Sequence, residues 1–291
     1  MWRWMAALAL VVGATVAQVA QAQQPALALD STYATRLKDG SLVIGRLAAQ
    51  SADTVQLVTT AGRLSVARAN VRDMRLVHAG EMHDGEYWPR DSHDTRLFFG
   101  PTGRTLHEGE GYFSDYWLFF GNVAYGVTDR LMVGVGMSLF PSSSFFSDNI
   151  YYVMPKVALV QHERFNLSLG GLVGFAGRGT SGTAGMMYLA ATNGLPDASL
   201  TYGVGWAYGG DKVHGDPALL LGGTRRISRR VALMSENYIF TGNAGGLVVP
   251  MYGVRLLGDR FTTDLGFLNA AGRGTTAVWP GVPWVGFALK F

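Results

Sequence analysis

From Thr95 to Phe291 the sequence consists largely of segments of about ten residues in which apolar side chains occupy every second position. The alternation is clearest over residues 131–139, 165–175, 200–208 and 284–291. Successive side chains of a β-strand point to opposite faces, so each segment predicts a strand with one apolar face and one small or polar face. The region is therefore expected to be all-β.

The composition separates this chain from soluble enzymes and from helical membrane proteins. Charged residues make up 15% of the sequence, against roughly 25% in ordinary globular domains, and 39 of the 291 residues are glycine. After residue 22 no uninterrupted apolar run reaches the ~18 residues that suggest a spanning helix. The chain has no cysteine and a net charge of only +3, so we expect no disulfide, no lipid-modified cysteine and no nucleic-acid partner.

The connections between the segments alternate in length. Tight polar turns are predicted at 128–130, 161–164, 228–229 and 258–260, and longer Gly-, Ser- or Asn-rich connections at 141–149, 178–183, 209–216, 242–246 and 270–281. Such alternation is typical of a transmembrane barrel with short turns at one end and long loops at the other. The alternative, a soluble all-β protein of the periplasm, would expose many rows of apolar side chains to water.

The number of strands follows from this alternation. If Tyr112–Tyr125 is one strand that leads into the turn at Thr128, the chain from Tyr112 to Phe291 contains eleven strand segments, this one included. A barrel with both ends on one side needs an even number, and Arg96–Pro101 supplies the missing first strand. We therefore predict an antiparallel up-and-down transmembrane barrel of about twelve strands over residues 95–291.

The last strand carries a more specific pattern. Val285, Phe287 and Leu289 alternate toward a terminal phenylalanine, Phe291. This resembles the signal by which outer-membrane barrels of Gram-negative bacteria are recognised by the barrel-assembly machinery. The resemblance implies an outer-membrane location, contact with outer-membrane lipid and that assembly route, but no particular activity.

The N-terminus predicts export. Arg3 is followed by a short apolar stretch, Met5–Val12, and by Ala20-Gln21-Ala22, which matches an A-x-A cleavage site. Residues 1–22 are therefore expected to be a signal peptide, with the mature chain beginning at Gln23. The stretch is shorter than the ~20 residues of a spanning helix.

Residues 23–78 predict a small β domain. Short strands are expected around 43–47, 55–59, 61–66 and 71–76, with hairpin turns at Asp39-Gly40 and Ala61-Gly62. This part resembles an Sm-like (SH3-type) small barrel, although the loop residues of the RNA-binding members are missing. We expect residues 30–78 to form a periplasmic module that docks on a protein or on cell-wall material.

Residues 79–94 are expected to be a linker, because charges cluster there with Gly80, Gly85 and Pro89. Its His and acidic residues could chelate a metal, but their spacing matches no standard site, so a solvated linker is preferred. Nothing in the sequence indicates a cofactor. Tryptophans such as Trp117 and Trp284 are expected in an interfacial aromatic girdle rather than in a sugar-binding platform.

Charged residues at inward positions are the best functional clue. Strand parity predicts that Arg96, Lys156, Glu236, Arg255 and Asp264 project into the lumen. Charges at membrane depth pair with one another or meet water, and they often line a pathway. Two interpretations remain open: a conducting pore, or a paired set of charges that closes the barrel.

These features lead to three functional hypotheses. The first is a narrow channel or transporter for small solutes, without enzymatic activity. The second is a non-conducting barrel that anchors the periplasmic module. The third, an acyl hydrolase acting on membrane lipids, has the least support, because the sequence contains no His-x-Ser pair of the kind that outer-membrane phospholipase places on one strand face.

Overall fold

The computed structural model describes residues 27–77, 79–91, 93–142, 144–175, 183–210, 212–213, 215–241, 246–272, 275 and 277–291. The chain divides into two compact units, Met1–Gly85 and Glu86–Phe291. The predicted signal peptide lies outside the described residues, as do most of the predicted connections 178–183 and 242–246. Within the described ranges, no helix is both long and apolar enough to cross a membrane.

The first unit is built on an antiparallel sheet, which has five strands in the described part of the chain. They are β1 (Thr32–Leu37), β2 (Leu42–Gln50), β3 (Thr54–Thr59), β4 (Gly62–Ala67) and β5 (Val71–Leu76), paired in the order β4-β3-β2-β1-β5. Two 3-10 turns, η2 (Arg68–Asn70) and η3 (Ala79–Glu81), and the short strand β6 (Met82–His83) complete the unit.

The core of this sheet is a cluster of Tyr33, Leu47, Val55 and Leu57. Turns occur at both predicted sites, where Gly40 and Gly62 have φ angles of +93° and +123°, a region that favours glycine. Among the described residues no pairing joins β4 to β5, so the sheet is open. The resemblance to a closed Sm-like barrel therefore stays a prediction.

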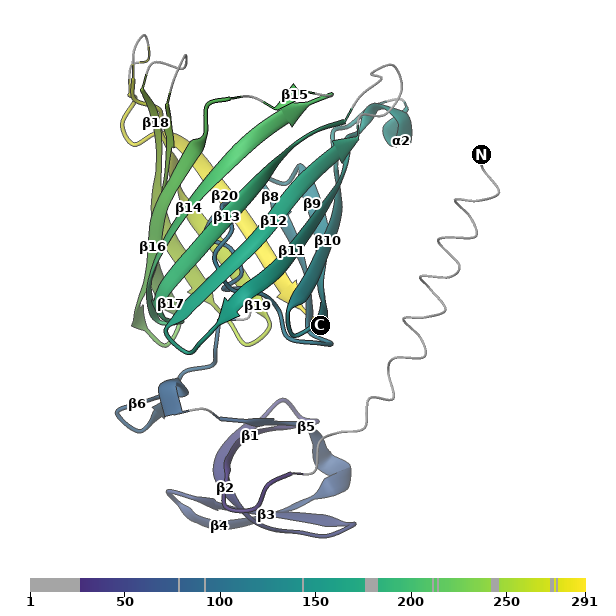
Figure 1. Ribbon diagram of the computed structural model, residues 1–291. Coiled ribbons are helices and arrows are strands. Elements are labelled where there is room, and N and C mark those ends of the chain that lie inside the picture. The colour runs from purple at the N-terminus through teal and green to yellow at the C-terminus, as the bar shows by residue number, and fades with distance from the viewer. Residues whose placement is uncertain are drawn as a thin grey trace. The chain divides into compact units, whose positions relative to one another are not determined.

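The second unit is a closed antiparallel β-barrel (Figure 1), which confirms the fold class and the strand number predicted for the second part of the chain. Over the described residues its wall has twelve strands: β8 (Gly111–Tyr116), β9 (Phe120–Thr128), β10 (Leu131–Ser138), β11 (Tyr151–Gln161), β12 (Phe165–Phe175), β13 (Thr183–Leu195), β14 (Ala198–Gly209), β16 (Ala218–Ser228), β17 (Val231–Phe240), β18 (Leu247–Leu257), β19 (Phe261–Leu268) and β20 (Val282–Lys290). Two short strands, β7 (Glu86–Tyr87) and β15 (Lys212–Val213), and a helical turn, α2 (Phe145–Asp148), lie outside the wall.

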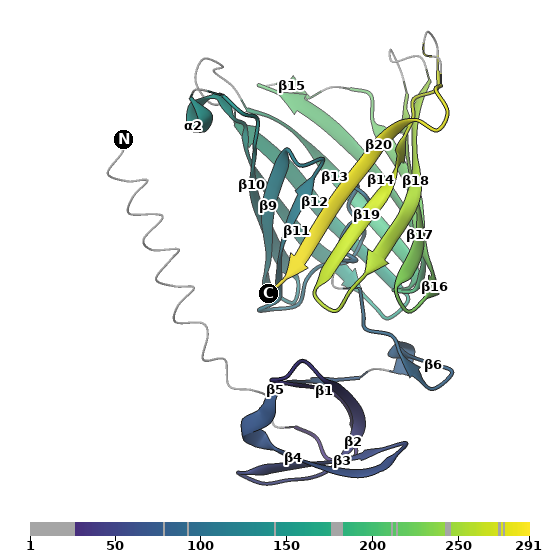
Figure 2. The same ribbon diagram turned by 180° about the vertical axis from the view of Figure 1, so that it is seen from behind.

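The two ends of the barrel differ as the connection lengths predict. The C-terminus and most of the tight turns, such as Asp129-Arg130 between β9 and β10, lie at one end. The long connections lie at the other end, together with the tight turn between β8 and β9 (Figure 1, Figure 2). We call these the short-turn end and the long-loop end. Along each strand, outward apolar residues such as Leu169 and Leu200 are exposed, whereas inward Ser168 and Thr201 are buried. The outside of the barrel is thus the apolar face.

The first strand of the barrel differs from the prediction. Arg96–Pro101 is not part of the wall, and the segment expected to be one strand, Tyr112–Tyr125, forms β8, the start of β9 and a tight turn between them. In this turn Trp117 and Leu118 have φ angles of 54° and 64°, and Phe119 N–H donates to the Tyr116 carbonyl at 3.1 Å.

The error has a physical cause. Two-residue hairpin turns with positive φ at both positions strongly favour Asn and Gly, and Trp117-Leu118 carries no such signal. The length of Tyr112–Tyr125 did argue against a single strand, because its 14 residues exceed the ~9–11 that one membrane strand needs. The predicted strand number was nevertheless correct, because two errors cancelled. The prediction counted β8 and β9 as one strand, and it added Arg96–Pro101 as a strand of the wall.

The barrel closes where β20 pairs with β8, from Gly286 opposite Tyr116 to Lys290 opposite Tyr112. Phe291 N–H extends this seam by donating to the Gly111 carbonyl at 3.0 Å. At the end of the seam, the ammonium of Lys290, the last residue of β20, lies 2.8 Å from the carboxylate of Glu110, which directly precedes β8. This ion pair joins the two chain ends of the barrel at the short-turn end.

The seam ion pair predicts an acid sensitivity. Burial of Glu110 opposes its ionisation, but Lys290 and the His107 N–H outweigh this and lower the pKa of the carboxyl below its ordinary value of 4.5. A depressed folded-state pKa stabilises the barrel above about pH 4.5, and that contribution is lost as the pH falls through the folded-state pKa. Between about pH 6 and pH 3 the wild type should therefore lose more thermal stability than Glu110→Gln, by at most ~1 kcal/mol because the pair is partly exposed.

Melting of the detergent-solubilised barrel, followed by gel mobility, measures this difference. Glu108→Gln, at an exposed site two residues away, is the matched control and should follow the wild type. Equal acid sensitivity of the wild type and Glu110→Gln would contradict the proposed role of the pair.

Candidate functional site inside the barrel

The lumen of the barrel contains a segment of the chain itself. Residues 88–91 and 93–110, which we call the lumen segment, run into the barrel and return to the start of β8 (Figure 1, Figure 2). The segment doubles back between Thr95 and Thr102, where Thr102 N–H donates to the Thr95 carbonyl at 3.0 Å and Leu97 N–H to the Gly100 carbonyl at 2.8 Å. Leu97 and Phe98, at the tip of this bend, are fully buried.

This arrangement corrects the prediction for residues 79–94. Its last part is not a solvated linker, because Asp91, His93 and Asp94 are buried inside the barrel. The partners that make this burial tolerable come from strands more than 100 residues away in some cases, such as Arg255, and these pairings left no local signal. Ser92 and His78 lie outside the described residues, and among the described ones no group of three His, Asp or Glu side chains could hold a metal ion.

All of the predicted inward charges lie inside the barrel and are buried, and each contacts the lumen segment or belongs to it. Lys156 extends from β11, Glu236 from β17, Arg255 from β18 and Asp264 from β19. Arg96 differs from its prediction, since it belongs to the lumen segment and not to a wall strand.

Glu236 binds the tip of the lumen segment. Its two carboxylate oxygens accept the N–H groups of Phe99 at 3.0 Å and Gly100 at 2.9 Å. The side chain is completely buried. A carboxylate in this position satisfies two backbone donors that would otherwise be unpaired in the interior, which fixes the height of the tip in the lumen.

Arg255 is the centre of the ion-pair network. It makes a bidentate contact with Asp264 on the adjacent strand, with N–O distances of 2.7 and 2.9 Å. It also donates to the Asp91 carboxylate at 2.8 Å and to the Leu97 and His93 carbonyls at 2.9 and 3.1 Å. Only 1% of the Arg255 side chain is exposed. One guanidinium therefore connects the wall to three points of the lumen segment.

Arg96 has a different environment. Its Nη1 donates to the Leu97 and Phe98 carbonyls and lies 3.4 Å from an Asp264 oxygen, and its guanidinium carbon is 4.3 Å from the centre of the Tyr116 ring. Among the described residues, the Nε and Nη2 atoms of this buried side chain have no hydrogen-bond partner. Arg96 therefore retains unused donors inside the barrel.

Three further contacts attach the lumen segment to strands β11, β12 and β13. Lys156 Nζ donates to the Thr95 carbonyl at 2.8 Å, and Ser168 on β12 donates to the Thr102 carbonyl at 3.2 Å. On β13, the Thr192 hydroxyl accepts the Gly103 N–H at 2.8 Å. The segment is thus held to the barrel wall from several directions.

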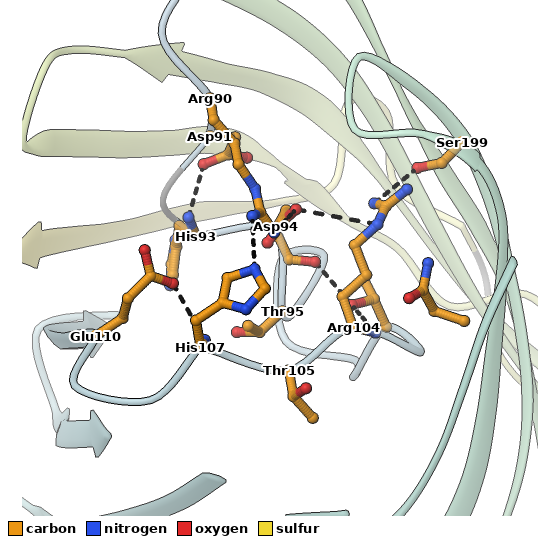
Figure 3. A network of polar contacts seen from close by, with 12 residues as sticks. Arg90, Asp91, His93, Asp94, Thr95, Arg104, Thr105, His107, Glu110 and Ser199 are labelled. Carbon is orange, nitrogen blue, oxygen red and sulfur yellow. Dashed lines mark hydrogen bonds and ion pairs between the residues drawn. The ribbon is translucent and has the colours of Figure 1, made fainter. Parts of the chain in front are cut away.

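A second polar cluster lies nearer the short-turn end (Figure 3). Asp94 lies 3.2 Å from Arg90 and 3.9 Å from Arg104, and Arg104 donates to the Gly194 carbonyl at 3.0 Å. Burial opposes ionisation of Asp94, but Arg90 and Arg104 outweigh it and lower the pKa of this carboxyl. Asp94 thus remains ionised and neutralises cations of the segment. Sequence reasoning missed this cluster, because a run of mixed charges is typical of a solvated linker as well.

A cavity of about 340 Å³ lies between the tip of the lumen segment and the long-loop end. Among the described residues its lining is apolar or aromatic throughout, and includes Trp117, Phe120, Tyr152, Tyr238, Met251 and Trp284. Trp284, predicted for the interfacial girdle, instead points inward and is 6% exposed. A smaller pocket of about 80 Å³ adjoins the cavity, and its lining includes Arg96 and Lys156.

Comparison with known proteins gives the following. No protein-family model matches the sequence, and no curated protein matches it. Among solved structures, the chain is similar to the KdgM porin in complex with disordered oligogalacturonate, with 10% identity, a TM-score of 0.44, and coverage of 62% of this chain and 98% of that one. It is also similar to a loop L8 deletion mutant of OmpT, an outer membrane protein of Vibrio cholerae, with 16% identity, a TM-score of 0.37, and coverage of 89% and 96%.

The Arg255 network predicts a large effect of a single substitution. Arg255→Met leaves the Asp264 and Asp91 carboxylates buried without their main partner, so we expect a loss of about 3–5 kcal/mol in the free energy of unfolding. Denaturant unfolding of the detergent-solubilised protein measures it.

Arg255→Met combined with Asp264→Asn should recover part of the loss, because fewer buried charges are then left without a partner. Arg230→Met, in an exposed turn, is the control for removing an arginine. If Arg255→Met and Arg230→Met had the same free energy of unfolding, the Arg255 network would not stabilise the barrel.

Proposed function

We propose that this chain is an outer-membrane channel for small solutes whose lumen is closed, in the conformation described above, by the lumen segment. Location in the outer membrane is supported by the closed barrel with its apolar outer face, because lipid tolerates no unpaired strand edge. The outward row Val285, Phe287, Leu289 and Phe291 on and after β20 is in keeping with recognition by the barrel-assembly machinery.

The observation that carries the channel proposal is the nature of the closure. The lumen contains a chain segment that makes polar contacts with the wall, such as those of Glu236 and Arg255. Each wall strand is already paired with two strand neighbours without it. Displacement of the segment would therefore open the lumen and break no strand pairing. Selectivity for charged solutes would then be set by the side chains that the displaced segment uncovers, namely Lys156, Glu236, Arg255 and Asp264.

Weakening the tip contact tests this proposal. Glu236→Ala leaves the Phe99 and Gly100 N–H groups without an acceptor, at a cost of about 1–3 kcal/mol per group. Because that cost falls on the closed state, we expect openings in planar-bilayer recordings to become at least about tenfold more frequent than in the wild type. Glu163→Ala, at an exposed site in a short turn, is the matched control.

A cross-link distinguishes movement of the lumen segment from movement of the external loops. The chain has no cysteine, so a pair introduced as Thr102→Cys and Ser168→Cys is unique, and the cross-link can be verified by mass spectrometry. The oxidised pair should remain closed, and reduction should restore openings. Openings that persist with the cross-link in place would place the gate elsewhere.

The second candidate function is a non-conducting anchor for the N-terminal sheet. It is favoured by the balanced charges of the lumen, since Arg255 is paired with two carboxylates. In that case wild type and Glu236→Ala would both be silent in the bilayer and would give no solute flux in liposomes. Deleting residues 30–78 would then abolish capture of a periplasmic protein or of cell-wall material.

A further inference from the structure

The half of the lumen near the long-loop end has an unusual surface for a solute channel. The interior of a water-filled membrane barrel is polar, but the cavity above the lumen segment is lined by aromatic and apolar side chains, including Trp284 and Phe120. Its volume of about 340 Å³ lies within the roughly 300–1,000 Å³ of small-molecule sites. Water in such a space finds few hydrogen-bond partners, whereas the transfer of an apolar molecule from water into it is favourable.

A smaller pocket adjoins the cavity and has four lining residues in common with it, namely Phe99, Tyr116, Met154 and Leu172. Its lining is also largely apolar, but it includes Arg96 and Lys156. The two neighbouring spaces thus offer an apolar region toward the long-loop end and, next to it, two cationic side chains that we call the base of the site.

The base of the site has hydrogen-bond donors without acceptors. Arg96 is 4% exposed, and its Nε and Nη2 have no partner among the described residues. Lys156 on β11 has one hydrogen bond within the described part of the chain, to the Thr95 carbonyl. Unpaired charged donors in the interior are costly, and a carboxylate is the acceptor that matches a guanidinium best.

The acidic residues near this base make most of their contacts with other groups. Asp264 is held by the bidentate contact with Arg255 and makes one longer contact with Arg96 Nη1, at 3.4 Å, and Glu236 accepts two N–H groups at the tip of the lumen segment. The Nε and Nη2 donors of Arg96 therefore still lack an acceptor among the described residues. This favours an anionic group over a neutral or cationic one.

We propose that the lumen binds an amphiphilic monocarboxylate, with its alkyl or aryl body in the aromatic cavity and its carboxylate at Arg96 and Lys156. The inference deepens the proposed function, on which it rests for the idea of passage, by naming the class of solute. Binding itself does not require the lumen segment to move.

Binding is tested with the full-length protein in lipid nanodiscs, because detergents are themselves amphiphiles. Calorimetric titrations with octanoate, octanol and octylammonium, corrected with empty nanodiscs, compare one chain length with three head groups. We expect octanoate to bind at least about tenfold more tightly than octanol, and octylammonium to bind most weakly. Equal affinity for the three, or no binding of octanoate, would overturn the proposal.

Variants separate the two halves of the site. Lys156→Met and Arg96→Met should each weaken octanoate about tenfold and leave octanol unchanged, with Arg230→Met as the control. Leu172→Trp, which fills the cavity, should abolish binding of both. Leu169→Trp, on the outward face of the same strand, should bind like the wild type. Unchanged octanoate affinity in the first two variants would remove the carboxylate assignment.

A second cavity-filling variant guards against a failure of Leu172→Trp to assemble. Met154→Trp fills the same space from β11. Unchanged octanoate binding in either variant, once it is assembled, would exclude the cavity as the binding site.

Bilayer recordings on the same samples distinguish the binding proposal from the channel proposal. Octanoate binding to a barrel that shows no openings would refute the channel but retain the site. Openings without octanoate binding would refute the site but retain the channel.

Discussion

In hydrocarbon every backbone N–H and C=O must find its partner within the protein, because no water is available to replace it. The pairing of β20 with β8 meets this requirement by removing the last free strand edges. The position of every other group depends on this closure. It fixes which side chains face lipid and which face the lumen, and it brings Glu110 and Lys290, 180 residues apart in sequence, into contact.

A barrel of this size encloses more space than its inward side chains fill, particularly where they are glycine or serine. The lumen segment occupies the half toward the short-turn end. Its Asp91 and Arg96 are paired with Arg255 and Asp264 of the wall, and its Gly100 N–H is accepted by Glu236. Toward the long-loop end, the described residues that line the cavity are aromatic or apolar. The lumen is therefore divided into a polar, filled half and an apolar half that contains the cavity.

Several features could be predicted from the sequence because they depend on local periodicity. Outward residues such as Leu169 and inward residues such as Arg255 follow directly from strand parity, and the turns follow from short polar sequences. The lumen segment could not be predicted in this way. Its hydrogen bonds go to side chains of distant strands. Until those partners are known, the charges and Pro89 of residues 79–94 resemble a linker, and Arg96–Pro101 resembles a strand of the wall.

The sequence by itself determined an antiparallel membrane barrel, its approximate strand number, and the inward direction of Lys156, Glu236, Arg255 and Asp264. These properties depend on a two-residue repeat that any strand must obey. Only the tertiary structure decided that these charges hold a segment of the same chain, that Arg96 belongs to that segment, and that Trp284 faces a cavity. Each of these depends on the closure of the barrel, which places residues from opposite ends of the chain around a single lumen.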